Sequence, residues 1–187
     1  MKILALDLST GRGTIAWAEG IADIFEVEFA NDRKHSGLFF ENLQQTLQRF
    51  GNPELIVVGL GPGSYAGTRI AIATATGLQA ATGARLVGLS SMRAFATDAA
   101  EYIVIGDARR QSFFFARVSQ RECVDGPLLC TRDELLSRLG DSAHPVFASE
   151  VIADAPGAIL GYPSARLLAE IAREPPDAFA SQPLEPI

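Results

Sequence analysis

Two aspartates, a hundred positions apart, each follow an apolar run and precede a polar turn. Asp7 is followed by Ser9 and Thr10, and Asp107 by a pair of arginines. Turn amides that approach phosphates, together with carboxylates that hold Mg²⁺, form a known arrangement for binding ATP. Asp7, Ser9, Thr10 and Asp107 are therefore candidate residues of a nucleotide site, either functional or vestigial. In the alternative interpretation, both aspartates only end strands and accept hydrogen bonds from the turn amides.

A glycine-rich segment, GLGPGSYAGTRI at residues 59–70, is the second candidate site. It is not a Walker A loop, because Gly67 is followed by Thr68 and Arg69 where that motif needs Lys and then Ser or Thr. It also lacks the third glycine of a dinucleotide fingerprint. Two uses stay open: anion binding at the start of the following helix, or close approach of two backbones.

The sequence offers neither a metal-binding motif nor a nucleophile motif. His35 has Phe39 four residues later, so the H-x-x-x-H pair of a helical metal site is absent. Ser64 lies one residue short of the G-x-S-x-G spacing of a nucleophile elbow. Cys123 and Cys130 are too far apart for a C-x-x-C pair, and we expect two free thiols. The chain is accordingly predicted to carry no cofactor or metal of its own.

Composition and charge exclude several classes of protein. The 187 residues are 48% apolar and 20% charged, which is typical of a soluble globular protein. No apolar run is long enough to span a membrane, and Asp7 interrupts the only apolar run that could belong to a signal peptide, so we expect a cytoplasmic protein without membrane contact. The net charge of −6 argues against a protein that grips nucleic acid alone.

The pattern of the first half predicts the elements that position these residues. Buried or alternating apolar runs predict strands, and apolar residues at three- and four-residue steps predict helices. In chain order, we expect strands at 2–8, 14–18 and 24–29, a helix at 36–50, a strand at 55–60, a helix at 67–82, a strand at 86–89 and a helix from Ser90 or Ser91 to about Ala100. This β-β-β-α-β-α-β-α order is that of a ribonuclease H-like α/β lobe.

The second half repeats the opening pattern in shortened form. An apolar strand, an aspartate, a turn with arginine and a second apolar strand recur from residue 102, which predicts lobes at 1–101 and 102–187; chance similarity of two hairpins is the alternative. Thr131 to Glu134 forms a capping-box pattern that opens a helix to about Leu139. Short strands are expected at 146–148 and 158–160. A last helix, at 164–173, would be free to pack back on the first lobe.

Two helices of the first lobe are candidate contact surfaces. The helix at 67–82 is rich in small residues, which let another element approach closely, and the helix at 36–50 has a wide apolar face. Packing inside the chain alone is the alternative. The residues that we expect at an interface are Leu38, Phe39, Leu43, Arg69, Thr74 and Leu78. We also expect a charge on a small residue of the second helix, as in Ala75→Glu, to break association and leave a folded monomer.

Several of these segments, in the same order and at similar spacing, resemble the TsaB (YeaZ) family over about the first 118 residues. The carriers of the resemblance are ILALDLST at 3–10, His35-Ser36, GPGSYAGTRI at 61–70, LVGLSS at 86–91 and DARR at 107–110. The resemblance implies an acetate kinase/sugar kinase/actin-like fold, that is, a duplicated ribonuclease H-like fold with mixed sheets and a reduced second lobe.

The resemblance also implies a function. It points to a non-catalytic dimerization or scaffold subunit for the tRNA modification N6-threonylcarbamoyladenosine (t6A). The implied partners are a TsaD-like transferase, which would carry the metal, a TsaE-like ATPase, a second copy of this chain, and tRNA reached only through the complex. Two other interpretations stay open: a small ATP-dependent phosphotransferase that uses Asp7 and Asp107, and a peptidase.

Overall fold

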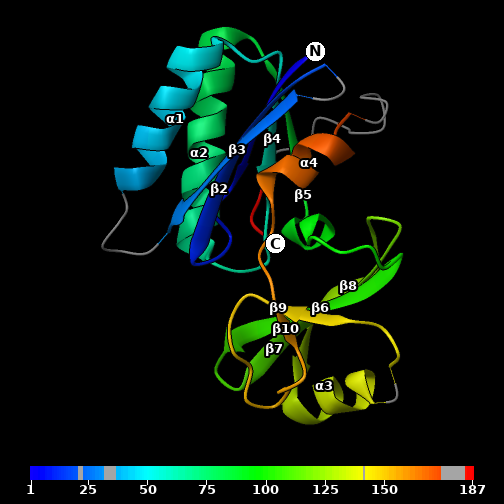
Figure 1. Cartoon of the computed structure of the whole chain (residues 1–187). Helices are drawn as coiled ribbons and strands as arrows, with labels where there is room; N and C mark the ends of the chain where they lie inside the picture. Colours follow the sequence, from blue (N-terminus) through cyan, green and yellow to red (C-terminus); the bar gives the residue numbers. More distant parts are fainter. Residues whose placement is uncertain (21–22, 32–36, 141, 174–183) are drawn as a thin grey trace.

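The computed structural model describes residues 1–20, 23–31, 37–140, 142–173 and 184–187, and it has two lobes, each built on a five-stranded mixed sheet (Figure 1). The strand order is β3-β2-β1-β4-β5 in the first sheet and β10-β9-β6-β7-β8 in the second. In both sheets, the first strand of the lobe is central, pairing antiparallel with the second and parallel with the fourth. The predicted duplication of a ribonuclease H-like unit is confirmed.

The first sheet contains β1 (Lys2–Asp7), β2 (Arg12–Glu19), β3 (Asp23–Ala30), β4 (Leu55–Gly59) and β5 (Arg85–Leu89). All five residues of β4 are buried, as are five of the six residues of β1. Such continuous apolar strands require cover on both faces of the sheet. Because side chains alternate along a strand, Leu4 and Leu6 enter one core while Ile3 and Ala5 enter another.

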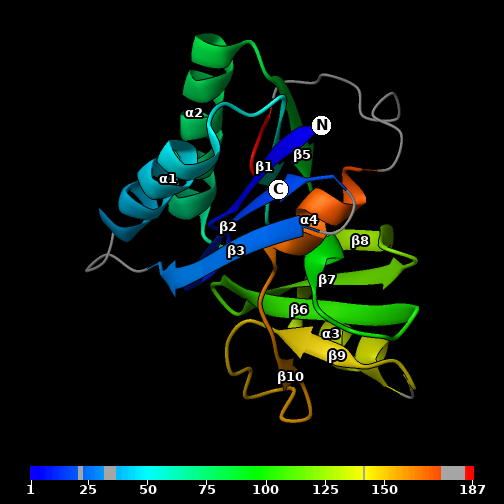
Figure 2. The same cartoon turned by 45° about the horizontal axis from the view of Figure 1, so that its top comes forward.

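Helices from distant parts of the chain cover the two faces (Figure 2). α1 (Gly37–Phe50) and α2 (Tyr65–Thr82) pack on one face, where Phe39, Leu43, Ala71 and Ala75 are buried. α4 (Ala165–Ile171) packs on the opposite face, where Leu168 is fully buried. The amide of Ala165 also donates to Thr14 Oγ1 at 3.0 Å, which ties the end of the chain to β2.

The second lobe is reduced in its helices and in its last strands. Its strands are β6 (Glu101–Arg109), β7 (Ser112–Ser119), β8 (Glu122–Thr131), β9 (Val146–Ala148) and β10 (Ile159–Leu160). α3 (Arg132–Leu139) lies between β8 and β9, and no helix lies between β9 and β10 in the part of the chain that the structure describes. The capping box that opens α3 is formed as predicted, with Thr131 and Glu134 bonded reciprocally.

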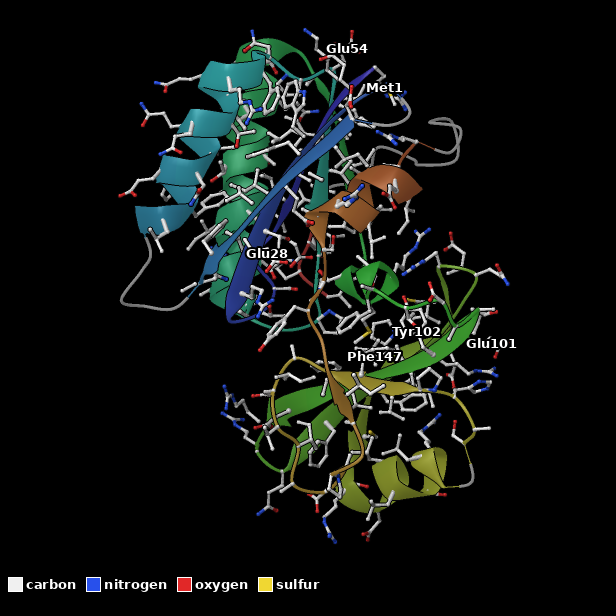
Figure 3. All side chains as sticks on the ribbon, in the orientation of Figure 1. Met1, Glu28, Glu54, Glu101, Tyr102 and Phe147 are labelled. Carbon is white, nitrogen blue, oxygen red and sulfur yellow. The ribbon has the colours of Figure 1, made fainter. Side chains whose placement is uncertain are left out.

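The lobes meet at a short 3₁₀ helix, η1 (Ser91–Ala94), where a longer helix to about Ala100 was predicted. That prediction is wrong, because the backbone beyond η1 is used by the second lobe: Phe95 forms a bridge with Pro163, and Arg121 donates to the carbonyls of Phe95 and Thr97. The hydroxyl of Tyr102 donates to the Met92 carbonyl at 2.9 Å, and Tyr102 packs edge-on against Phe147 in the core beside this junction (Figure 3).

Other differences are at element ends. α2 begins at Tyr65, two residues before the predicted start, because the Ser64 side chain accepts from the Gly67 amide at 3.2 Å and caps the helix. β8 was not predicted, since its ten residues include Gly126 and Pro127 and alternate poorly. The predicted helix start at Ser36, like His35, lies outside the described residues.

Candidate functional site

The carboxyl group of Asp7 is sealed inside the first lobe. Asp7 is 1% exposed, and its Oδ1 accepts from the amide of Ser9 at 2.8 Å and from the hydroxyl of Ser9 at 2.6 Å. Oδ2 makes no geometrically acceptable hydrogen bond with the described residues and lies against Gly59, where a β-carbon on that glycine would be 1.9 Å away. Burial, which disfavours the charged form, raises the pKa of this carboxyl above its ordinary value, although Ser9 and the nearby Ser91 hydroxyl oppose the rise.

The glycine loop closes over the turn that follows Asp7. The Ser64 amide donates to the Ser9 carbonyl at 2.6 Å. A β-carbon on Gly63 would lie 2.1 Å from the Ser9 carbonyl oxygen, and one on Gly67 would lie 2.1 Å from the Leu8 carbonyl oxygen. Only glycine permits such contacts between two backbones. The glycine loop therefore packs directly against the backbone of the turn between β1 and β2.

Three further amides, of Gly61 in the loop and of Gly67 and Thr68 in the first turn of α2, bond within the chain. The amide of Gly61 donates to Ser91 Oγ at 3.0 Å, that of Gly67 to Ser64 Oγ, and that of Thr68 to the Ser64 carbonyl at 2.9 Å. A phosphate cradle needs such amides to point at the ligand. Of the two uses that the sequence left open for this loop, the geometry favours close backbone packing.

Asp107 has a different environment from Asp7. Its Oδ1 accepts from the Arg109 amide at 2.6 Å, and its other oxygen lies 3.5 Å from the Arg109 guanidinium. It lines an interlobe cavity of about 300 Å³ whose other walls come mostly from apolar residues. Those residues are Pro62, Gly63, Ala108, Phe114, Pro127, Leu128, Leu129 and Ile187. Asp7 is not among them, so the two aspartates do not face each other across this cavity. Thr10, like Ser9, is buried beside Asp7.

The outer face of α2 is exposed and almost without charge. Its helix of 18 residues contains a single charged residue, Arg69, and the opposite face packs into the core through Ala71 and Ala75. Ala75 is fully buried, so our expectation that it lies on a contact face was wrong; a helix with small residues all round gives no sign of which face packs on the sheet. The exposed residues are Tyr65, Ala66, Arg69, Ile70, Ala73, Thr76, Gly77, Ala80 and Ala81.

The six predicted interface residues lie in different surroundings. Arg69 is exposed, whereas Leu38, Thr74 and Leu78 are half-buried. Phe39 and Leu43 are 3% and 5% exposed and belong to the core between α1 and the first sheet. The exposed aromatic of the adjacent pair is Phe40, which is 53% exposed, because neighbours on a helix point about 100° apart.

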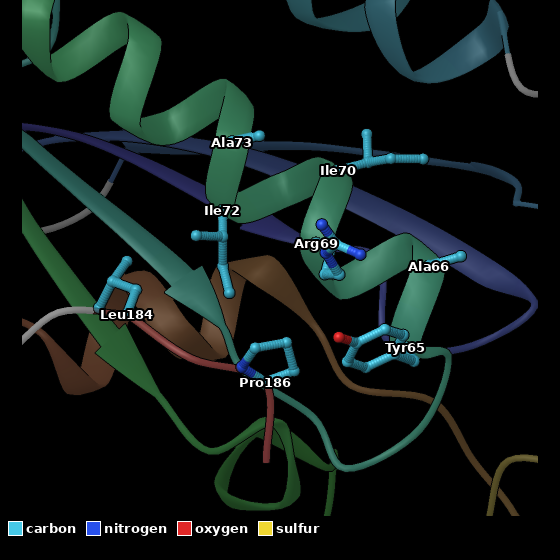
Figure 4. A pocket seen from close by; sticks show the side chains of 8 residues that line it. All are labelled: Tyr65, Ala66, Arg69, Ile70, Ile72, Ala73, Leu184 and Pro186. Atoms are coloured by element: carbon cyan, nitrogen blue, oxygen red, sulfur yellow. The ribbon is translucent and has the colours of Figure 1, made fainter.

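A cavity of about 570 Å³ lies beside the exposed face of α2 (Figure 4). Six of its lining residues belong to α2: Tyr65, Ala66, Arg69, Ile70, Ile72 and Ala73. The other two, Leu184 and Pro186, come from the C-terminal segment, which the amide of Ile187 ties to the Leu60 carbonyl at 2.8 Å. Sequence reasoning missed this wall, because nothing local in four residues without regular structure indicates where they pack.

The described residues offer little further chemistry. They hold no group of three or more histidine, cysteine, aspartate or glutamate side chains that could bind a metal ion. His144 is half-buried, with Nε2 3.4 Å from a Glu101 oxygen. None of the helices in the described part of the chain is both long and apolar enough to cross a membrane.

Comparison with known proteins agrees with this fold. Residues 30–129, more than half of the chain, match the family model described as TsaD: tRNA N6-adenosine threonylcarbamoyltransferase. The solved structure of YeaZ from Pseudomonas aeruginosa has 17% identity and a TM-score of 0.78, and the match covers 100% of both chains. A Pseudomonas aeruginosa protein described as uncharacterized, with similarity to peptidase YEAZ, has 19% identity and a TM-score of 0.75 over 100% of this chain and 98% of its own. The chain therefore belongs to the family that the TsaD model describes and has the whole-chain fold of YeaZ, which confirms the resemblance seen in the sequence.

Proposed function

We propose that this chain is a non-catalytic scaffold subunit in t6A modification of tRNA, and that it binds and activates a TsaD-like transferase through α1 and α2. The observation that carries the proposal is the outer face of α2, an exposed surface of small and apolar residues beside an open cavity of about 570 Å³. Exposed apolar side chains that gather beside a cavity mark interaction sites on soluble proteins. The family match supports the t6A assignment.

The state of Asp7 supports a non-catalytic role. A carboxylate that holds Mg²⁺ must present an oxygen to the ion, but both oxygens of Asp7 are buried under Gly59 and the Ser9 turn. We propose that the nucleotide chemistry of this fold is vestigial here and that ATP and the metal belong to partner subunits. A TsaE-like ATPase joins the same assembly, and tRNA is reached through the complex rather than held by this acidic chain.

The test is a reconstitution in which single components are left out. TsaD-like and TsaE-like proteins of the same organism are combined with threonylcarbamoyl-adenylate and tRNA, with and without this chain, and t6A is measured by mass spectrometry. We expect product only when the chain is present. The Asp7→Asn variant should support the same yield of t6A. If the chain were instead a phosphotransferase that uses Asp7, the purified wild-type chain would hydrolyse ATP without any partner, and Asp7→Asn would abolish that activity.

The docking surface is tested with two matched variants, in each of which an exposed alanine is replaced by glutamate. Ala73→Glu puts a charge on the exposed face of α2, and Ala153→Glu puts the same charge on an exposed turn of the second lobe. We expect Ala73→Glu to abolish both binding of the TsaD-like protein and t6A formation, and Ala153→Glu to change neither. Equal t6A yields without the chain would refute the proposed role, and a wild-type yield with Ala73→Glu would refute the proposed surface.

A further inference from the structure

A β-bulge lies beside Asp107, near the end of β6. The pairing of β6 with β7 shifts register between Asp107 and Arg109. Bulges of this kind redirect a side chain and are frequent next to functional sites. Here Asp107 borders the interlobe cavity of about 300 Å³, and it is the single charged residue among the described residues that line it. Its carboxylate therefore sets the charge that a ligand in this cavity must carry.

One oxygen of this carboxylate can accept a new donor. Oδ1 accepts from the Arg109 amide at 2.6 Å, but Oδ2 has only the Arg109 guanidinium near it, at 3.5 Å, and that side chain is 80% exposed. An ion pair so open to water contributes little, so a ligand can replace it. Glu150 brings a second carboxylate to the same place, because its Oε1 accepts from the Asp107 amide at 3.3 Å. Neither Arg109 nor Arg110 lines the cavity.

The remaining walls are apolar and partly uncovered. The Phe114 ring fills the space above Gly106, where a β-carbon would lie 2.1 Å from the Phe114 Cζ atom. An aromatic ring that shares a cavity with a carboxylate suits a cation, which both groups attract. Leu129 lines the same cavity and is 77% exposed, so a ligand with an apolar body would remove leucine surface from water.

We infer that the interlobe cavity binds a small organic amine, with its ammonium group on Asp107 and its apolar body against Phe114 and Leu129. The ammonium donates a charge-assisted hydrogen bond to Oδ2, and such bonds are stronger than neutral ones. The cavity of about 300 Å³ equals the volume of about ten water molecules in the liquid, so an amine of about ten non-hydrogen atoms fits. The site belongs to this chain alone and does not depend on its proposed role in t6A modification.

Two other occupants match the cavity less well. The phosphates of a nucleotide would face Asp107 among apolar walls, and the glycine-loop amides of Gly61 and Ser64 already bond within the chain. A second copy of the chain would need a broad surface, since a stable interface uses about 20–30 residues a side. Nine residues line this cavity, and they come from both lobes, which is typical of a site for a small molecule.

The experiment is an NMR titration of the isotope-labelled full-length chain with three probes of one shape and different charge: phenethylamine, phenethyl alcohol and hydrocinnamate. The backbone amides of Gly63 and Ala108, one from each lobe, report binding in the cavity. Four forms are compared: wild type, Asp107→Asn, Leu129→Ala and Asp133→Asn. Asp133 is the control, because it is an exposed acid of the second lobe that does not line the cavity. Thermal unfolding first establishes that each form is folded.

We expect the amine to bind the wild type about 10-fold more tightly than the alcohol, the usual difference between a charged and a neutral hydrogen bond. Asp107→Asn should remove this difference by weakening only the amine. Leu129→Ala should weaken the amine and the alcohol by a similar factor of about 3 to 10, because both lose the same apolar contact. Hydrocinnamate should not bind, and Asp133→Asn should behave like the wild type.

Several results would overturn the inference. If Asp107→Asn binds the amine as tightly as the wild type, the carboxylate does not hold the ammonium. If hydrocinnamate binds more tightly than the amine, the site takes anions. If the amine shifts neither reporter amide, it does not enter the cavity.

The two other occupants have tests of their own. ATP with Mg²⁺ that displaces the amine from the wild type would assign the cavity to a nucleotide. Shifts of the Gly63 and Ala108 amides with the concentration of the chain alone would assign it to a second copy. Because each titration uses the purified chain without partners, a negative result leaves the proposed function in t6A modification untouched.

Discussion

Gly67 offers the sharpest test of the glycine loop as a backbone-packing element. It is the third residue of α2, and its α-carbon faces the Leu8 carbonyl so closely that a β-carbon would lie 2.1 Å from that oxygen. Separations below 3.0 Å are essentially not observed, so Gly67→Ala must move the helix away from the hairpin turn by about 1 Å or more. The opposing atom is backbone, which cannot rotate out of the way as a side chain can.

The expected magnitude combines a gain with a larger loss. Replacing glycine by alanine inside an ordinary helix stabilises it by about 0.8–1.0 kcal/mol. Overpacking typically costs about 1–3 kcal/mol. Moving α2 also stretches the bond from the Ser64 amide to the Ser9 carbonyl, worth about 1 kcal/mol. We expect Gly67→Ala to lower the free energy of unfolding by about 2–3 kcal/mol, which corresponds to a decrease in Tm of about 5–10 °C for a chain of this size.

Gly77→Ala is the matched control in the same helix. Gly77 is exposed, and a β-carbon there would meet nothing within 4 Å. This variant should raise the free energy of unfolding by about 0.8 kcal/mol. The assay is urea denaturation followed by the fluorescence of Trp17, the only tryptophan of the chain, which is 2% exposed and stacks on Phe50 in the same lobe. A urea midpoint for Gly67→Ala at or above that of the wild type would refute the argument that the loop packs against the Leu8 carbonyl.

Three further predictions follow from burial and capping. Burial raises the pKa of Asp7, so the protonated carboxyl contributes stability that is complete below about pH 3.8 and is lost as the pH rises through the folded pKa. Urea midpoints should therefore show Asp7→Asn gaining on the wild type as the pH rises above about 4, and parallel midpoints would contradict this. Ala75→Glu buries an unpaired charge and should destabilise the isolated chain by more than about 4 kcal/mol. Ala73→Glu, on the exposed face of α2, should change the Tm by less than about 2 °C. Similar thermal unfolding of the two variants would show that the two helix faces are assigned wrongly. Thr131→Ala removes the cap of α3 and should lower the free energy of unfolding by about 1 kcal/mol, measured by circular dichroism, with Thr131→Ser as the variant that keeps the cap and should stay close to wild type.

The internal duplication could be predicted from sequence, but the unequal cover of the two sheets could not. Asp7 and Asp107 each follow an apolar strand, and that repeated pattern correctly indicated two related hairpins. The structure then gives the first sheet helices on both faces, one of them α4 from the far end of the chain. In the second lobe, residues 149–158 connect β9 to β10 through turns, where the first lobe has the long helix α2 between its last two strands.

The sequence alone determined every strand except β8, most helix ends and the chain's family, because these depend on residues close together along the chain: apolar runs, capping residues such as Thr131, and the motif at 61–70. Only the tertiary structure decided which side chains are free to act. The sequence shows that Asp7 has a carboxyl group that could bind a metal ion, but only the structure shows that Gly59 and the Ser9 turn bury this group away from solvent. Arg69 borders a cavity only because Leu184 and Pro186, more than a hundred positions away, form the other wall. Burial and cavities depend on contacts between distant segments, and no local pattern of residues encodes them.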